Sequence, residues 1–173
     1  MSEVSRSSED VSGEAEGAPL SVWDRVRVLV VDDDACNQMV AEALLNTLGY
    51  YNVAIANNGV EALAACRVAP PDMVLMDIEM PLMGGLEAAA GLRALQRLGT
   101  LPHFPIVAAT SGSDRFPKSA CLGAGLDGYL TKPLDPQVLE KEFHRVLSTR
   151  LVSLRNPLPK AGDLMIPGAA HEA

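Results

Sequence analysis

The sequence predicts an α/β fold in which five parallel strands alternate with five helices. Five short apolar runs recur along the chain, and a segment with helical spacing of its apolar residues follows each run. The runs are largely continuous rather than alternating, which is typical of strands that helices bury on both faces. Four of the five runs end in a polar residue, so the carboxyl ends of the strands are expected to carry the chemistry.

Cap and turn residues set the limits of these elements. Asp34 and Asn58 can cap the first and second helices, and Gly49 ends the first. The fourth helix is short, with Asp114 as its candidate cap, and Pro117 is tolerable only in its first turn. The expected strands span residues 26–31, 52–56, 72–76, 104–109 and 126–130. The expected helices span residues 35–48, 59–68, 86–97, 114–123 and 136–149.

The order of the strands follows from the connections between them. Crossovers between parallel strands are right-handed, so successive βα units place helices on both faces of one sheet. We expect the strand order 2-1-3-4-5 and a flavodoxin-like (βα)5 sandwich of three layers. This order makes the first and third strands neighbours. Asp32 and Asp33 follow the first strand and Asp77 follows the third, so their carboxylates are expected to lie together.

The composition supports one folded domain with a hydrophobic core. The chain has 173 residues, of which 48% are apolar and only 4% aromatic, so the core is expected to be aliphatic. Residues 1–24 contain six acidic residues and one arginine, and we expect a disordered acidic N-terminal arm there. The folded domain is expected over residues 25–149. Residues 150–173 are expected to form a tail, docked or loose, that is too short for an effector domain.

Charge and hydropathy argue against several classes of protein. The formal net charge of −8 is unsuited to a nucleic-acid surface, which needs clustered Lys and Arg. No apolar stretch approaches the roughly 20 residues that span a bilayer, and the acidic N-terminus is unlike a secretory signal. We therefore expect a cytoplasmic protein without nucleic-acid or membrane partners. Cys36, Cys66 and Cys121 have no CxxC spacing and are expected to be buried free thiols.

A hydroxyl and an ammonium group join the three carboxylates at the expected sheet edge. Thr110 follows the fourth strand and Lys132 follows the fifth. Carboxylates within a few ångströms repel one another, and without a cation one of them would hold a proton. Mg²⁺ is a hard cation that takes few protein carboxylates together with phosphate oxygens. The edge is therefore a candidate site for Mg²⁺ and a phosphoryl group, whose transfer needs positioning and charge neutralisation.

Four short motifs, each at the end of an expected strand, together resemble one family. They are Val-Val-Asp-Asp at 30–33, Met-Asp-Ile-Glu-Met-Pro at 76–81, Ala-Thr at 109–110 and Lys-Pro at 132–133. In this order and spacing, residues 26–147 resemble the receiver domain of two-component response regulators, in particular the single-domain chemotaxis regulators. The resemblance implies phosphorelay signalling by a phosphoacceptor switch, which catalyses only its own phosphorylation and dephosphorylation.

The resemblance implies a role for each residue at the centre of the site. Asp77 matches the aspartate that accepts a phosphoryl group from a histidine kinase or a histidine phosphotransfer protein. Asp33 matches a direct Mg²⁺ ligand, and Asp32 matches its partner, which usually acts through water. Asp77 also belongs to the implied metal site, and the backbone carbonyl of Glu79 completes it.

The resemblance also implies a conformational switch. Thr110 matches the hydroxyl that turns toward the acyl phosphate, Lys132 the ammonium that pairs with it, and Tyr129 the aromatic ring that moves with the hydroxyl. Tyr129 would equally suit a plain core position. The Lys132-Pro133 peptide bond is expected to be cis. The implied output is binding of a downstream protein target by the face made of the fourth helix, the fifth strand and the fifth helix.

The chain departs from the family pattern near the implied phosphosite. Gly84 stands where Asp is common, and Ser111 stands where Ala is frequent. Glu79 places a carboxylate two residues after Asp77. We expect its charge to repel an attacking water or a phosphatase and so to slow the loss of the phosphoryl group.

Two other classes of function are alternatives to the switch. A receiver-like docking module that works without phosphate would keep the fold but would not need the Asp, Thr and Lys set. An aspartyl-phosphate hydrolase also uses an aspartate nucleophile with Mg²⁺ on a parallel sheet, and Glu79 lies at the spacing of its second acid. However, Met80-Pro81 follows where such enzymes typically have Thr or Val, and the chain leaves little room for a substrate cap.

Overall fold

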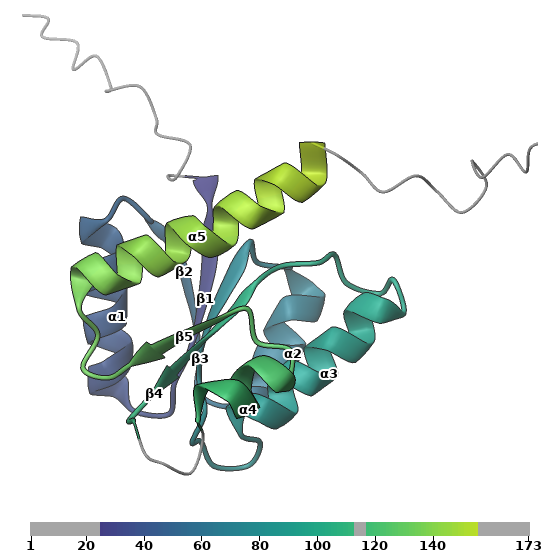
Figure 1. Cartoon of the computed structure of the whole chain (residues 1–173). Helices are drawn as coiled ribbons and strands as arrows, with labels where there is room; N and C mark the ends of the chain where they lie inside the picture. Colours follow the sequence, from purple (N-terminus) through teal and green to yellow (C-terminus); the bar gives the residue numbers. More distant parts are fainter. Residues whose placement is uncertain (1–24, 113–116, 156–173) are drawn as a thin grey trace, which may run out of the picture.

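Five parallel strands form the central sheet of the computed structural model, which describes residues 25–112 and 117–155 (Figure 1). The strand order β2-β1-β3-β4-β5 confirms the expected flavodoxin-like topology. The strands are β1 (Arg27–Val31), β2 (Asn52–Ala56), β3 (Met73–Asp77), β4 (Ile106–Thr110) and β5 (Gly128–Thr131). The helices are α1 (Ala35–Thr47), α2 (Gly59–Val68), α3 (Gly85–Arg97), α4 (Lys118–Gly123) and α5 (Pro136–Arg155).

Helices cover both faces of the sheet and form the three layers that the sequence predicts. In Figure 1, α1 and α5 lie on one face, and α2, α3 and α4 lie on the other. Strands β3 and β4 are buried along their whole length, as continuous apolar runs predict. The core on the α1 and α5 face includes Leu45, Tyr50 and Phe143. The core on the opposite face is rich in alanine and includes Leu92 and Phe104.

Side-chain caps begin α1 and α2 at the residues that the sequence predicts. The Asp34 carboxylate accepts hydrogen bonds from the backbone amides of Cys36 (2.7 Å) and Asn37 (3.0 Å). The Asn58 side-chain oxygen accepts a hydrogen bond from the amide of Glu61 (3.0 Å), and its NH₂ group donates back to the Glu61 carboxylate (3.1 Å). Each cap satisfies amide donors that the first turn of a helix leaves unpaired. The Asp34 cap thereby fixes the residue at which α1 begins, next to the acidic cluster.

The limits of the last two helices differ from the expected ones. α4 begins at Lys118 with Pro117 as its N-cap, and the expected cap Asp114 lies outside the described residues. α5 continues past Thr149 to Arg155, because no Gly or Pro interrupts the chain before Pro157. The expected arm over residues 1–24 and most of the expected tail also lie outside the described residues. None of the described helices combines the length and the hydropathy needed to cross a membrane.

The three free thiols differ in exposure. Cys66 and Cys121 are buried as expected, but Cys36 is exposed, so the expectation of a buried thiol is wrong there. Cys36 occupies the first turn of α1, directly after the Asp34 cap, where the helix emerges from the sheet edge. Burial raises the pKa of the Cys66 thiol to about 12, so this group stays protonated at neutral pH.

Arg93 of α3 joins the amino-terminal ends of β4 and β5, at the sheet edge opposite the expected site. Its guanidinium donates hydrogen bonds to the carbonyl oxygens of Gly125 (2.8 Å) and Phe104 (2.9 Å) and pairs with the Asp127 carboxylate. That carboxylate also accepts a hydrogen bond from the Ile106 amide (2.7 Å). The planar guanidinium presents several donors in a fixed geometry. One side chain therefore holds three segments of this edge together.

Gly85→Ala is expected to destabilise the protein by about 2 kcal/mol, within the usual range for overpacking. A Cβ atom on Gly85 would lie 2.0 Å from the Asp77 carbonyl oxygen, so the start of α3 or the end of β3 would have to shift. Chemical denaturation measures the loss. Gly123→Ala is the control, because nothing lies within 4 Å of a Cβ at that position. A Gly85→Ala variant as stable as this control would contradict the prediction.

Candidate metal and phosphoryl site

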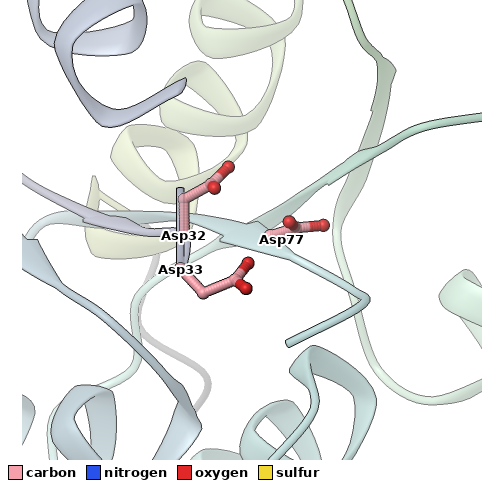
Figure 2. A group of neighbouring side chains, drawn as sticks. All are labelled: Asp32, Asp33 and Asp77. Carbon is pink, nitrogen blue, oxygen red and sulfur yellow. The ribbon is translucent and has the colours of Figure 1, made fainter. Parts of the chain in front are cut away.

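Two neighbouring strands bring three carboxylates together at the carboxyl edge of the sheet (Figure 2). β1 pairs with β3 in parallel, with Val31 opposite Met76. Asp32 and Asp33 follow β1 and Asp77 ends β3, so one oxygen from each carboxylate lies within 4.8 Å of the others. Asp32 and Asp77 are buried, whereas Asp33 is exposed. The structure therefore brings together the three acidic residues that the sequence predicts to be neighbours.

Lys132 reaches this cluster from the loop after β5. Its Nζ donates hydrogen bonds to Asp32 Oδ2 (2.5 Å) and to Asp77 Oδ2 (2.8 Å). Its backbone amide donates to the carbonyl oxygen of Thr110 (2.7 Å), which fixes the loop against the end of β4. The Lys132-Pro133 peptide bond is cis, as the resemblance implies. One ammonium group thus bridges the two buried carboxylates.

Burial and charge act in opposite directions on the groups of this site. Burial raises the pKa of Asp77, the Lys132 ammonium lowers it, and the neighbouring Asp32 raises it, with a net increase. Burial alone would lower the pKa of Lys132, but its hydrogen bonds and charge interactions with both carboxylates raise it overall. Lys132 is therefore a stable cation at neutral pH. Asp77 is more readily ionised with this cation, or another one, beside it.

The two candidate switch residues lie on β4 and β5. Thr110 is fully buried, and its Oγ1 accepts a long hydrogen bond from the Gly112 amide (3.4 Å). Tyr129 is half-buried and packs against the core on the α2, α3 and α4 face. The Tyr129 amide donates to the Glu142 carboxylate of α5 (3.2 Å). The Tyr129 side chain therefore contributes to the core and its backbone amide links β5 to α5, while a switch role for the ring stays a prediction.

Glu79 contacts Asp77 through its backbone amide, and its side chain contacts the loop after β4. Its amide donates to Asp77 Oδ1 (3.3 Å). Its exposed carboxylate accepts a hydrogen bond from Ser111 Oγ (3.2 Å), which joins the loops after β3 and β4. A negative charge therefore stands two residues from the candidate phosphoacceptor. Coordination of a metal by the Glu79 carbonyl stays a prediction.

Asn37 and Gln38 contact the site, although the sequence analysis did not single them out. Asn37 Nδ2 donates to Asp32 Oδ1 (3.2 Å), and Gln38 Nε2 donates to the Asp32 carbonyl oxygen (2.6 Å). Gln38 Nε2 also donates to Asn57 Oδ1, in the loop after β2 (3.0 Å). Helical side chains point back toward the start of their helix. Two amide side chains early in a helix that follows an aspartate are the signal that could have revealed these contacts.

A cavity of about 140 Å³ opens beside the carboxylates, between α1 and the loop after β5. Val40 and Ala41 line it from α1, and Leu134 lines it from the loop. Asp32 and Lys132 also lie on its wall, so an apolar recess borders the charged site directly. Val40 is 52% exposed and lies next to Met39, which is 69% exposed.

The donor set suits a hard divalent cation. All three acidic groups offer carboxylate oxygens, the ligands that Mg²⁺ prefers, and no sulfur or imidazole group is needed to complete the cluster. The Asp33 carboxylate is exposed, so a cation could keep several of its waters there, as Mg²⁺ usually does. That Asp33 and Asp77 hold such an ion directly stays a prediction. Its charge would favour the ionised form of Asp77, which burial otherwise disfavours.

Comparison with known proteins identifies the family. Residues 28–144 match the family model of the response regulator receiver domain, and the chain belongs to this family. A curated relative, the sensor protein GacS of Pseudomonas syringae pv. syringae, is 37% identical over 144 residues. The match covers 83% of this chain but only 15% of GacS. The chain is thus a receiver domain of two-component phosphorelay signalling, as the sequence motifs predict, and it spans a small part of the length of that relative.

Two solved structures are similar in fold and informative about receiver sites. The receiver domain of the sensor histidine kinase PA1611 from Pseudomonas aeruginosa PAO1 has a magnesium ion coordinated in its active-site cleft. It is 31% identical, with a TM-score of 0.63, and the match covers 71% of this chain and 98% of that one. The receiver domain of Ssk1 from Saccharomyces cerevisiae was solved with the phosphotransfer protein Ypd1. That match has a TM-score of 0.67 at 26% identity and covers 75% and 94% of the two chains.

Asp77→Asn is expected to increase the free energy of unfolding by about 1 kcal/mol at pH 7 in the absence of divalent cations, a common size for a stabilising substitution. The pKa of Asp77 is raised in the folded state, so stability is lost as the pH rises above the ordinary value of 3.8, because Asp77 ionises in the unfolded chain before it ionises in the folded one. The gain in the free energy of unfolding should therefore shrink as the pH falls below 3.8, where Asp77 is protonated in both the folded and the unfolded chain.

Urea denaturation in EDTA at several pH values measures this effect. Asp33→Asn is the control, because the Asp33 carboxylate is exposed and its charge is screened by solvent. A loss of stability in Asp77→Asn at neutral pH, or a gain that is the same at every pH, would show that burial of the ionised group is not the cause.

Proposed function

We propose that Asp77 accepts a phosphoryl group from a phosphohistidine of a histidine kinase or a histidine phosphotransfer protein. The observation that carries this proposal is the position of the Asp77 carboxylate, at a strand end between the Lys132 ammonium and two further carboxylates. An Asp77 oxygen attacks phosphorus, and the bond from phosphorus to the donor imidazole nitrogen breaks. That nitrogen keeps the electron pair, so the donor is released as neutral histidine once the ring has its proton.

The residues of the site supply positioning and charge for this transfer. Asp33 and Asp77 would bind Mg²⁺ directly, with Asp32 acting through water and the Glu79 carbonyl as a further ligand. When bound, Mg²⁺ offsets the negative charge of the carboxylates and of the incoming phosphoryl group. Lys132 already contacts Asp77 and would pair with a phosphoryl oxygen on the same side. Most of the catalytic effect then comes from pre-placed charges rather than from proton transfer.

We propose that the phosphorylated form is read through Thr110 and Tyr129. Within residues 25–112 and 117–155, the Thr110 hydroxyl makes a single, long hydrogen bond, with the Gly112 amide (3.4 Å), so little is lost when the hydroxyl turns toward a phosphoryl oxygen. An ion pair at about 4 Å contributes roughly 4 kcal/mol at an effective dielectric constant near 20. This is comparable to the roughly 5.5 kcal/mol that moves a two-state equilibrium from 1:99 to 99:1. The face formed by α4, β5 and α5 would then bind a downstream protein target.

The phosphodonor is proposed to dock over the start of α1. Met39 and Val40 expose apolar side chains there, and the cavity between α1 and the loop after β5 lies next to them. A donor protein that covers these groups would also cover Asp33 and bring its histidine to the carboxylate cluster. The protein partner bound to the receiver domain of Ssk1 is of this donor class.

The proposed function predicts Mg²⁺-dependent phosphorylation by a small acyl phosphate such as acetyl phosphate. The wild-type chain should gain one phosphoryl group, and Asp77→Asn should gain none, because the acceptor oxygen is replaced by an amide. Intact-protein mass spectrometry measures the gain. Asp135→Asn is the matched control, since it changes another aspartate, whose capping contacts with the amides of Gln137 and Val138 an Asn can keep.

The same experiment separates the alternatives. Labelling of Asp77→Asn at the wild-type rate would refute Asp77 as the acceptor. No labelling of the wild type with Mg²⁺ present would refute the proposal and favour a phosphate-independent docking module. Steady turnover of an added phosphoester would favour a hydrolase. In amide NMR spectra, beryllofluoride with Mg²⁺ should shift resonances as far as Tyr129 in the wild type but not in Asp77→Asn.

Glu79→Asn is expected to speed loss of the phosphoryl group about fivefold, since about 1 kcal/mol of like-charge repulsion would be removed. The Glu79 carboxylate is exposed and accepts a hydrogen bond from Ser111, the residue after Thr110, so an approaching water or phosphatase would meet its charge. The decay of phosphorylated protein, followed after removal of the donor, measures the rate. Glu87→Gln removes an exposed carboxylate from the first turn of α3 and should leave the decay unchanged. An unchanged decay in Glu79→Asn would contradict the prediction.

A further inference from the structure

The Asp32 carboxylate is held from two opposite sides. Its Oδ2 accepts the short hydrogen bond from Lys132 Nζ (2.5 Å). Its Oδ1 accepts hydrogen bonds from the Asp34 amide (3.0 Å) and from Asn37 Nδ2 (3.2 Å). Only 5% of Asp32 is exposed, so these protein donors replace most of the water that would otherwise solvate the charge. The orientation of this carboxylate therefore depends on the balance between Lys132 and the two donors on Oδ1.

Asn37 is well placed to set that balance. It lies in the first turn of α1, whose start is fixed by the Asp34 cap, so its side chain approaches Asp32 from a rigid element. Nε2 of Gln38, the next residue, donates hydrogen bonds to the backbone carbonyl oxygen of Asp32 (2.6 Å) and to Asn57 Oδ1 in the loop after β2 (3.0 Å). The backbone and the side chain of one buried acid are thus each held by an amide side chain of the same helix.

A divalent cation at this site would bind carboxylates that Lys132 already contacts. The ammonium contacts Asp32 and Asp77, and both belong to the three-carboxylate cluster. If the Asn37 contact were lost, one donor fewer would hold Oδ1, and the carboxylate could turn both of its oxygens toward Lys132. Groups that orient the acidic residues of a metal site usually affect metal affinity for this reason.

We propose that Asn37 is a positioning residue, which keeps the Asp32 carboxylate available to a divalent cation against the attraction of Lys132. The inference rests on the proposed function of the site and adds a residue to it. It differs from a purely structural role, because the effect of Asn37 must depend on the presence of the Lys132 ammonium.

A double-mutant cycle on the full chain tests this dependence. Amide NMR shifts during a Mg²⁺ titration give the dissociation constant for the wild type, Asn37→Ala, Lys132→Met and the double variant. Asn37→Ala should weaken Mg²⁺ binding about fivefold, less than many such changes because the Asp34 amide still holds Oδ1. In the Lys132→Met background the same substitution should change the affinity less than about twofold, which is the signature of two coupled residues.

Two further variants and one further measurement complete the design. Asn46→Ala makes the same change at an exposed position of the same helix and should leave the affinity unchanged. Asn37→Ser, whose side chain is too short to span the same distance, should reproduce the loss seen with alanine. Urea denaturation of each variant reports stability separately from metal affinity.

The outcomes distinguish this inference from the proposed function. Wild-type affinity in Asn37→Ala, with or without a loss of stability, would overturn the positioning role while leaving the proposed function intact. An equal loss in both Lys132 backgrounds would also overturn it, because no competition would be involved. A wild-type chain that shows no Mg²⁺-dependent shifts would instead refute the metal site itself, and the inference with it.

Discussion

The ammonium group of Lys132, held between the two buried carboxylates of Asp32 and Asp77, is the interaction on which the site depends. Two carboxylates this close and this shielded from water would be costly without a cation, since each charge loses hydration and repels the other. The contacts join residues that are 100 and 55 positions apart in the chain, so they form only when β1, β3 and β5 share one sheet. The charged site is therefore assembled only when the sheet has formed.

The parallel sheet explains why so much of this arrangement could be predicted. Its strands are apolar on both faces, so polar residues can stand only at their ends, and a parallel order delivers all the carboxyl ends to one edge. The strand order and the meeting of Asp32, Asp33 and Asp77 follow from this constraint. The caps at Asp34 and Asn58 were equally predictable, because Asp and Asn directly before an apolar helical pattern typically accept hydrogen bonds from the amides of the first turn.

The contacts that escaped prediction depend on details that apolar periodicity does not encode. Asn37 and Gln38 reach Asp32 because α1 enters at a particular angle after its cap, and a hydropathy pattern carries no information about that angle. The hydrogen bond from Ser111 to Glu79 joins two loops whose conformations are set by the strands that hold them. The exposure of Cys36 has the same origin. Its position in the first turn of α1 does not reveal whether the thiol faces the sheet or the solvent until the packing of the helix on the sheet is known.

The anchor formed by Arg93 has a consequence for how motion can travel through the molecule. It fastens α3 to the segments that lead into β4 and β5, at the edge remote from the acidic cluster. At the carboxyl edge the ends of the same strands are joined by Lys132, through the Thr110 carbonyl oxygen and the two buried carboxylates. A chemical event at the acidic cluster would therefore change contacts at this edge, whereas the Arg93 contacts at the opposite edge involve none of the reacting groups.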